Sequence, residues 1–125
     1  MINFTPSGST NTGDQNDTPY LANDTIFIKE GHDFHKVKFD EITYLSSDHV
    51  YVTIHTTKKK FLVRASLQKY LEKFDPAKFV RVHQRYAVNI NKVEKINSIY
   101  LIVNNEEIPI SKSYHHTLLG SLNLG

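Results

Sequence analysis

Short runs in which apolar and polar residues alternate, each closed by a turn signal, recur along most of this sequence. Alternation places every second side chain on the same face of an extended chain, so it is typical of β-strands with one buried face. Runs such as His49 to Thr56 and Lys60 to Arg64 follow one another closely enough to pair as hairpins. The sequence therefore predicts a mainly β fold, a multi-stranded antiparallel domain of about eight to ten strands with one or two short helices.

Turn residues set the expected limits of the strands. Gly31-His32-Asp33, Ser46-Ser47-Asp48, Thr57-Lys58-Lys59 and Asn104-Asn105 are each typical of turns. Around them we expect strands at 25–29, 34–39, 42–45, 49–56, 60–64, 79–90 with a break, 93–96, 99–103 and 107–110. Pro109 has no backbone N–H to donate, so the last strand is expected at an edge of its sheet.

Two segments change to a helical period. Between Ser66, a good helix cap, and the stop signal Asp75-Pro76, apolar residues recur every three or four positions. A partner-binding helix would show the same stripe, but a segment this short in a strand-rich chain favours a place in the core. Ser111 or Ser113 can cap a closing helix, whose expected inward side chains are Tyr114, Leu118, Leu119 and Leu122.

Composition divides the chain near residue 24. Residues 1–24 are mostly Ser, Thr, Asn, Gly, Asp and Pro, with too few apolar residues to offset the entropy of ordering. We expect a flexible tail or interdomain linker there, and a disordered terminus without function is the equal alternative. Residues 25–125 are long enough for one hydrophobic core and are expected to form one domain.

One stretch, from Phe79 to Ile90, interleaves apolar residues with cationic and hydrogen-bonding ones. Its alternation breaks at His83-Gln84-Arg85, which predicts a turn or bulge carrying polar side chains. No carboxylate occurs between Asp75 and Glu94 to compete for the cations. Because these side chains can donate hydrogen bonds to phosphate or to base edges, the stretch predicts an anion-facing edge.

The charges are unevenly placed along the chain. The net charge is +2, but all 15 Lys and Arg residues follow residue 25, together with ten of the 13 Asp and Glu residues. A basic globular part favours a polyanionic partner, and Gln84 and Asn89 have amides that could read base edges. The alternative is a solvated strand edge, since Lys and Arg on strands commonly stay solvated.

Catalytic and metal-binding patterns have no specific support. The seven histidines lack the spacing of zinc ligands, and no His-Glu-x-x-His or cysteine frame occurs. Asp48, His49 and Ser111 could be assembled into a triad, but there is no strained serine elbow or glycine-rich oxyanion loop. The five glycines form no phosphate-binding motif. We therefore expect neither an enzyme nor a bound metal or cofactor.

Compartment signals are weak but agree with one another. No apolar run approaches the roughly 20 residues that cross a bilayer, and the start Met1-Ile2-Asn3-Phe4 lacks the regions of a signal peptide. The chain has no cysteine, which fits a reducing cytosol. We expect a cytoplasmic protein that does not span a membrane.

From Ile26 to Leu122 the chain resembles the LytTR family of DNA-binding domains, the output modules of many bacterial response regulators. The family pattern Phe-x-Arg-x-His-Arg-Ser-Tyr-Val-Val-Asn is met by Phe79, Arg81, His83, Tyr86, Val88 and Asn89. Further support comes from Ile42-Thr43-Tyr44-Leu45, Tyr51-Val52, Arg64-Ala65-Ser66-Leu67 and Ile108-Pro109-Ile110-Ser111-Lys112.

This resemblance implies an elongated all-β fold that sets loops, rather than a recognition helix, into successive major grooves of a DNA duplex. It implies base-edge contacts from His49, Gln84 or Arg85, and Lys112. It implies phosphate contacts from Arg81, His83, Lys92 and Ser111.

The chain departs from the family pattern at Gln84-Arg85, where Arg-Ser is common. If Gln84 reads a base, adenine N6 and N7 become its preferred partners, but alternation could turn Arg85 to the opposite face, so which of the two touches DNA stays open. His83 has an equal structural alternative, in which its ring nitrogens bond the neighbouring backbone and hold the loop shape. Asn89, at a strand end, is expected to be a structural hydrogen-bonding residue.

The predicted function is sequence-specific binding of double-stranded DNA by the effector domain of a two-component transcriptional regulator. The resemblance implies an upstream receiver domain, which is not among these 125 residues, a dimer in the full-length protein or on DNA, and paired direct repeats as the DNA site. Two alternatives remain: a β-rich protein-interaction module with Tyr and Phe anchors, and a His-dependent phosphodiesterase.

Overall fold

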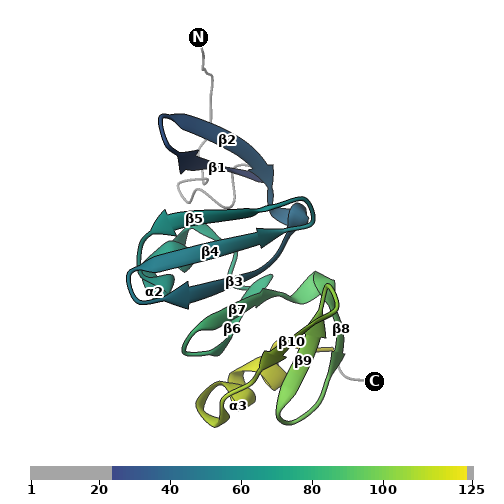
Figure 1. The fold of residues 1–125 in the computed structure, drawn as a ribbon. Helices are drawn as coiled ribbons and strands as arrows, with labels where there is room; N and C mark the ends of the chain where they lie inside the picture. Colours follow the sequence, from purple (N-terminus) through teal and green to yellow (C-terminus); the bar gives the residue numbers. More distant parts are fainter. Residues whose placement is uncertain (1–23, 124–125) are drawn as a thin grey trace, which may run out of the picture.

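The computed structural model describes residues 24–123 of the chain. In that range ten strands form three antiparallel sheets, which follow one another from an N-terminal hairpin to a C-terminal sheet with its helix (Figure 1). The mainly β, antiparallel and elongated architecture is therefore confirmed. The tail expected at residues 1–24 lies, apart from Asp24, outside the described residues.

The N-terminal sheet is a hairpin of β1 (Thr25–Glu30) and β2 (Asp33–Lys38). Gly31 supports the turn with a backbone φ of 66°, a conformation that glycine adopts without steric cost. The inner face of the hairpin buries Ile28 and Val37, as alternation predicts.

The central sheet has five strands in the order β5-β4-β3-β7-β6. Their bounds are β3 Ile42–Asp48, β4 Tyr51–Thr56, β5 Lys60–Arg64, β6 Phe79–His83 and β7 Tyr86–Asn89. The predicted break of Phe79 to Ile90 is confirmed, since Gln84 and Arg85 form the turn between β6 and β7.

The turn predicted at Ser46-Ser47-Asp48 is wrong. These residues continue β3, and the chain reverses at His49 and Val50 instead. Their polar side chains are compatible with a strand because Ser46 Oγ lies 2.9 Å from His55 Nε2 on the neighbouring strand, and Asp48 reaches solvent at the strand end. Composition suggested a turn, but cross-strand pairing decides the structure.

The first predicted helix is confirmed in place but is shorter than its apolar stripe. It comprises α2 (Leu67–Tyr70) followed by the 3₁₀ turn η3 (Leu71–Lys73). Ser66 caps it, because its side chain accepts a hydrogen bond from the Lys69 backbone N–H at 3.2 Å. Its apolar side chains belong to the core, as predicted: Leu67, Tyr70 and Phe74 are buried there.

The C-terminal sheet, in the order β10-β9-β8, precedes the closing helix. The elements are β8 Val93–Ile96, β9 Tyr100–Val103, β10 Glu106–Pro109 and α3 Lys112–Gly120. Elsewhere, two further 3₁₀ turns are η2 Phe39–Glu41, before β3, and η4 Ile90–Lys92, before β8. Pro109 lies on an edge strand, as predicted. Of the expected inward residues of α3, Leu118 is fully buried, whereas Leu119 is exposed, so that part of the prediction is wrong.

Two hydrophobic clusters lie on opposite faces of the central sheet. Leu45 and Ala87 belong to the cluster shared with the N-terminal hairpin and α2, whereas Tyr44 and Val88 belong to the cluster shared with the C-terminal sheet and α3. Neighbours along β3 and β7 thus point into different cores. These two strands are buried on both faces, which gives the loops at their ends a fixed base.

Candidate functional site

One end of the central sheet gathers loops from distant parts of the chain. The turn at His49-Val50 lies beside the turn at Gln84-Arg85, because Ser47 donates its backbone N–H to the Arg85 carbonyl at 2.9 Å. The start of α2 is fastened there by Ala65 N–H, which donates to the Val50 carbonyl at 2.9 Å. On the other side, Ser111 N–H donates to the Val82 carbonyl at 2.9 Å and brings in the start of α3.

Two adjoining hollows lie between these loops, of about 440 and 390 Å³. They share Gln68, Arg81 and Gln84. We call their combined lining the loop surface; its other members are Ser47, His49, Ser66, Leu67, His83, Arg85, Ser111, Ser113 and Tyr114. In Figure 1 the loops that carry it follow the long axis of the molecule along one side.

Arg81 lies at the middle of the loop surface and is fixed by backbone carbonyls. Its Nε donates to the His83 carbonyl at 3.3 Å, and its guanidinium NH₂ group donates to the Gln84 carbonyl. Its Cζ lies 5.6 Å from the centre of the Tyr114 ring on α3. Because a guanidinium has five N–H donors, these two bonds leave donors for an anion while they fix the position of the charge.

His83 is fixed by the loop that it belongs to. Its Nδ1 accepts a hydrogen bond from the Arg85 backbone N–H at 3.0 Å, and its ring lies edge-on to Tyr86 with 5.5 Å between centroids. One ring nitrogen of His83 thus bonds the neighbouring backbone, as the structural alternative predicts. Since Nδ1 accepts, the neutral ring carries its proton on Nε2, which leaves an N–H donor at the other end of the ring.

Gln84 and Arg85 are both exposed and both border the hollow of about 390 Å³. They are the two turn residues between β6 and β7, so strand alternation does not send them to opposite faces. Gln84 also borders the other hollow, beside Ser111. The loop surface can therefore present an amide and a guanidinium side by side.

His49 is held away from the body of the molecule. Its backbone φ is 57°, in the left-handed region, and its imidazole Nε2 lies 3.5 Å from Asp48 Oδ1 with both side chains mostly in solvent. A contact this exposed contributes little to stability. The geometry leaves the imidazole accessible at the tip of the β3–β4 turn.

The start of α3 supplies Ser111 and Lys112. Ser111 occupies the cap position without a side-chain cap bond, and its Oγ lies 3.2 Å from Ser113 Oγ. Lys112 is exposed at the first residue of the helix. Lys92 is placed differently: it lies in η4, which follows the opposite end of β7, so the structure does not bring it to the loop surface.

Asn89 is structural, as predicted. It is buried, and its Nδ2 donates to the Ile42 carbonyl at 2.9 Å while its Oδ1 accepts from the Asn91 N–H at 3.1 Å. The first bond ties β7 to the start of β3, and the second joins it to η4. An amide used on both sides in this way is not available to a ligand.

Sequence reasoning missed Gln68, Ser66 and Tyr114 as parts of this surface. One signal could have found Gln68: β5 runs in the same direction as β3, so a helix that starts directly after β5 begins at the same sheet end. A polar residue in its first turn, on the face opposite the apolar stripe, must then border the loops.

The loop surface carries more positive than negative charge. Arg81, Arg85 and Lys112 lie on or beside it, and Arg64 stands at the same sheet end, with its Cζ 6.0 Å from the Tyr51 ring. Asp48 is the carboxylate nearest to the β3–β4 turn. Charged donors grouped with two amides and two imidazoles suit a ligand with several anionic groups.

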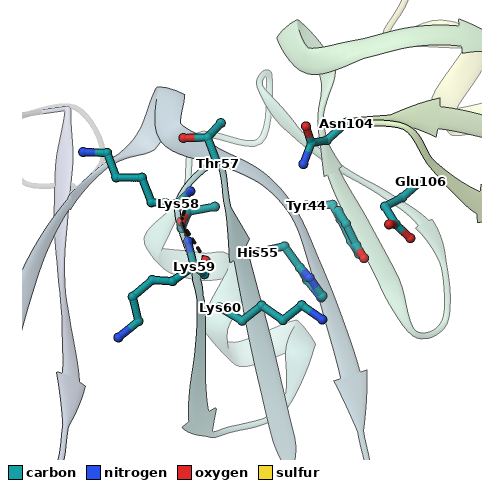
Figure 2. A pocket seen from close by; sticks show the side chains of 9 residues that line it. Tyr44, His55, Thr57, Lys58, Lys59, Lys60, Asn104 and Glu106 are labelled. Atoms are coloured by element: carbon teal, nitrogen blue, oxygen red, sulfur yellow. Dashed lines mark hydrogen bonds between the residues drawn. The ribbon is translucent and has the colours of Figure 1, made fainter.

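A separate pocket of about 250 Å³ lies at the opposite end of the β4–β5 hairpin, facing the C-terminal sheet (Figure 2). Its wall includes His55 stacked on Tyr44, with 3.9 Å between ring centroids, and both Lys60 and Glu106. Burial, and to a lesser degree the neighbouring Lys60, lowers the pKa of His55 from 6.5 to about 4. This pocket mixes both signs of charge and is distinct from the loop surface.

Residues 24–123 hold neither a candidate metal site nor a membrane-spanning helix. No three His, Cys, Asp or Glu side chains in that range are grouped so that they could hold a metal ion. No helix there is long and apolar enough to span a bilayer.

Comparison with known proteins gives one consistent result. Residues 32–123 match the LytTr DNA-binding domain family. A solved structure, the LytTr DNA-binding domain of a Bacillus cereus protein named as a methyl-accepting/DNA response regulator, superposes with a TM-score of 0.72. It is 22% identical and covers 82% of this chain and 100% of its own, so it shares the fold.

Curated relatives are similar over most of this chain. An uncharacterized response regulatory protein of Vibrio cholerae is 23% identical over 70% of this chain and 37% of its own length. The transcriptional regulatory protein LytR of Staphylococcus aureus is 23% identical over 93% of this chain and 52% of its own length. The chain thus spans about half, or less, of the length of these relatives.

Proposed function

The chain belongs to the LytTr DNA-binding domain family, and on this premise we propose that its loop surface binds double-stranded DNA and reads the base sequence. One observation carries the proposal: Arg81, Arg85 and Lys112 are grouped with Gln84 and His49 along one side of an elongated domain. A duplex lying along that side meets the loops one after another, as successive major grooves require.

Phosphate contacts set the register in this proposal. Arg81 keeps donors free beyond its two bonds to backbone carbonyls, and His83, whose Nδ1 is occupied by the Arg85 N–H, is proposed to contact phosphate through Nε2. Ser111 adds a hydroxyl at the start of α3. Lys92, remote from the loop surface, is proposed to reach a phosphate outside the part of the duplex that the loops cover.

Base-edge contacts come from the exposed tips. Gln84 is suited to adenine N6 and N7, whereas Arg85 and Lys112 are suited to guanine O6 and N7. His49 supplies a ring nitrogen at the β3–β4 turn. Because Gln84 and Arg85 stand side by side, we assign both to base reading, on neighbouring base pairs.

The wider role follows from the relatives, which are about twice as long as this chain or longer and are named as regulatory proteins. We assign residues 25–125 to the effector domain of a two-component transcriptional regulator in the bacterial cytoplasm. Residues 1–24 would link it to a receiver domain, whose phosphorylation would pair two copies on repeated DNA sites.

A salt titration tests the DNA-binding proposal against its rivals. Binding of the protein to a pool of labelled duplexes is measured across a salt series, and the retained duplexes are sequenced. If about five phosphates are neutralised, log K falls with log salt at a slope near −4 to −5. No affinity at low salt would favour a protein-interaction module, and cleavage of the duplex would favour a phosphodiesterase.

Two substitutions then separate the assigned roles on the selected sequence. Gln84→Ala should reduce the discrimination between bases at one position of the site by about 1 to 3 kcal/mol, because a side chain that can form two hydrogen bonds to one base is lost. Arg81→Ala should lower the affinity for all sequences by a similar factor, because its contact is to phosphate. Lys73→Ala, an exposed cation in η3 off the loop surface, is the matched control. If Gln84→Ala and Arg81→Ala lowered the affinity equally, and equally for every DNA sequence, the assignment would be contradicted.

A further inference from the structure

The pocket shown in Figure 2 lies apart from the loop surface, at the opposite end of the β4–β5 hairpin. Its volume of about 250 Å³ is below the range of about 300 to 1,000 Å³ that is typical of sites for drug-sized ligands, so its ligand would be smaller. Tyr44, His55 and residues 56–60 form the wall contributed by the central sheet and its β4–β5 turn. Asn104, in the β9–β10 turn, and Glu106, at the start of β10, form the other wall. A ligand in this pocket would therefore contact two sheets at once.

The hydroxyl of Tyr44 is a polar group of this pocket that residues 24–123 leave without a hydrogen bond. Tyr44 is only 7% exposed, and its ring stacks on His55 with 3.9 Å between centroids and 11° between ring planes. Burial, followed by the charge of Glu106 and the neighbouring Tyr86, raises the pKa of the hydroxyl, so it keeps its proton and remains a donor. In Figure 2 it points toward Glu106. Because buried polar groups are normally hydrogen-bonded, a donor placed at a cavity in this way is suited to a ligand.

The pocket also holds one charge of each sign that no ion pair within residues 24–123 neutralises. Two of its three lysines pair with glutamates, at 3.6 and 3.1 Å. The third, Lys60, takes part in no ion pair in that range, and neither does Glu106. Lys60 lies opposite His55 in the register of β4 and β5. Glu106 is close enough to Tyr44 to raise its pKa, so the two charges flank the stacked rings.

His55 adds a hydrogen-bonding ring to the pocket without adding charge. Its Nε2 lies 2.9 Å from Ser46 Oγ. Because burial, and to a lesser degree Lys60, lowers its pKa to about 4, the ring is neutral near pH 7. The unpaired charges that a ligand meets are thus the ammonium of Lys60 and the carboxylate of Glu106. Glu106 would repel a simple anion and Lys60 a simple cation, whereas a ligand with both charges finds a partner for each.

We propose that this pocket binds a small zwitterion of the free α-amino acid class. The ligand carboxylate bonds the ammonium of Lys60 and accepts a hydrogen bond from the Tyr44 hydroxyl, while the ligand ammonium donates to Glu106. Thr57 and Asn104 give a polar wall to the rest of the ligand, which favours a small or polar side chain. The inference goes beyond the proposed DNA binding and does not rest on it, because the pocket and the loop surface lie at opposite ends of the β4–β5 hairpin.

A ligand bound in this way would join two sheets that are not paired with each other. Lys60 belongs to β5 of the central sheet, and Glu106 belongs to β10 of the C-terminal sheet. Since the ligand meets both residues together only in the folded domain, its binding should raise the melting temperature as the ligand concentration rises.

A nuclear magnetic resonance titration of the isotope-labelled 125-residue chain tests the binding. The probes are glycine, L-serine and L-glutamine, each added separately. At least one should bind with a Kd of about 0.1 to 1 mM, with chemical-shift changes centred on the residues of the pocket. The N-acetyl form of that amino acid lacks the ammonium, and its amide form lacks the carboxylate. Each should bind about tenfold more weakly, because a hydrogen bond to a charged group is lost.

Substitutions identify which residue holds which end of the ligand. Glu106→Gln should lower the affinity for the amino acid about tenfold but leave the affinity for its N-acetyl form unchanged. Lys60→Met should lower the affinity for the amino acid by a similar factor but leave the affinity for its amide unchanged. Tyr44→Phe keeps the ring that stacks on His55, and should weaken the binding of the two forms that carry a carboxylate but not of the amide. Structural damage alone would weaken the binding of all forms alike.

Two matched controls lie outside the pocket. Glu107→Gln removes a carboxylate one residue further along β10, on the other face of the strand. Lys36→Met removes an exposed cation of β2. Neither substitution should change the affinity for any of the three forms.

The remaining outcomes would overturn the inference. One is the absence of chemical-shift changes at the pocket with all three amino acids at millimolar concentrations. Inorganic phosphate that binds as tightly as the amino acid would show a site for anions instead. Putrescine that binds as tightly as the amino acid would show a site for cations.

Discussion

Individual polar side chains in this domain are held by the backbone more than by one another. Arg81 donates to two carbonyls, His83 accepts from an N–H, and Asn89 bonds two strands. Such bonds fix a side chain without a second mobile side chain, so little entropy is lost when a ligand arrives. At this scale the domain is preorganised for contacts that its loops make.

His55 predicts a dependence of stability on pH. Its folded pKa of about 4 lies below the ordinary value of 6.5, so the unfolded chain binds more protons between these two values. The stability contributed by the neutral ring is complete above pH 6.5 and is lost as the pH falls toward 4. Because the ring is only half-buried, we expect about 1 kcal/mol lost from pH 7 to pH 5 after allowance for solvent screening.

Urea unfolding at both pH values measures this loss. The control is His55→Phe, which can still stack on Tyr44 but cannot titrate. Between pH 7 and pH 5 the free energy of unfolding should fall by about 1 kcal/mol less in the variant than in the wild type. An equal pH dependence of the two proteins would show that the proton is taken up elsewhere.

Of the two α-helices, α2 is the shorter, and its cap joins the core to the loop surface. Ser66 accepts from Lys69 N–H, and the same first turn carries the buried Leu67 and the exposed Gln68. Ser66→Ala should lower the free energy of unfolding by about 1 kcal/mol and weaken DNA binding modestly, because the turn that positions Gln68 frays. Thermal unfolding and a duplex titration measure the two effects, and Ser66→Asp, which retains a capping oxygen, should restore the stability. A stability unchanged in Ser66→Ala would contradict the cap.

Hairpins were predictable from this sequence wherever alternation and turn chemistry agreed, as at Gly31 and at Asn104-Asn105. The β3–β4 turn was misplaced because Ser46 to Asp48 have turn-like composition. Their strand conformation comes from pairing with β4 and, at Ser46, from pairing with Tyr86 of β7, which is distant in sequence. The extent of α2 was overestimated because the apolar stripe continues through a 3₁₀ turn, which shares much of the helical spacing.

The candidate site was predictable in its centre and not at its margins. His83, Gln84 and Arg85 were found because the break in alternation marks a polar turn. Tyr114 was missed because it reaches the loop surface through packing of α3, which local sequence does not encode. Gln68 was missed because the direction of β5, which indicates its sheet end, was not followed into α2. The resemblance placed Lys92 among the phosphate contacts, but β7 carries it to the opposite end of the sheet from the loop surface.

The whole domain is built around a sheet that is buried on both faces. Leu45 and Leu118 are fully buried in different clusters, yet β3 and β7 contribute to both clusters. We expect Leu45→Ala and Leu118→Ala each to cost about 2 to 5 kcal/mol, and the domain still to unfold in a single transition. Urea unfolding followed by far-UV circular dichroism and by tyrosine fluorescence checks this, and two separate transitions in either variant would contradict it.

The left-handed backbone of His49 has a consequence for how its contribution should be measured. Alanine has no side-chain hydrogen bond to support a φ of 57°, and this conformation costs most L-residues about 1 to 2 kcal/mol. The effect of His49→Ala would therefore combine the cost of straining the turn with the loss of the imidazole. Asparagine tolerates the same backbone, so His49→Asn is the reference against which the imidazole itself can be weighed.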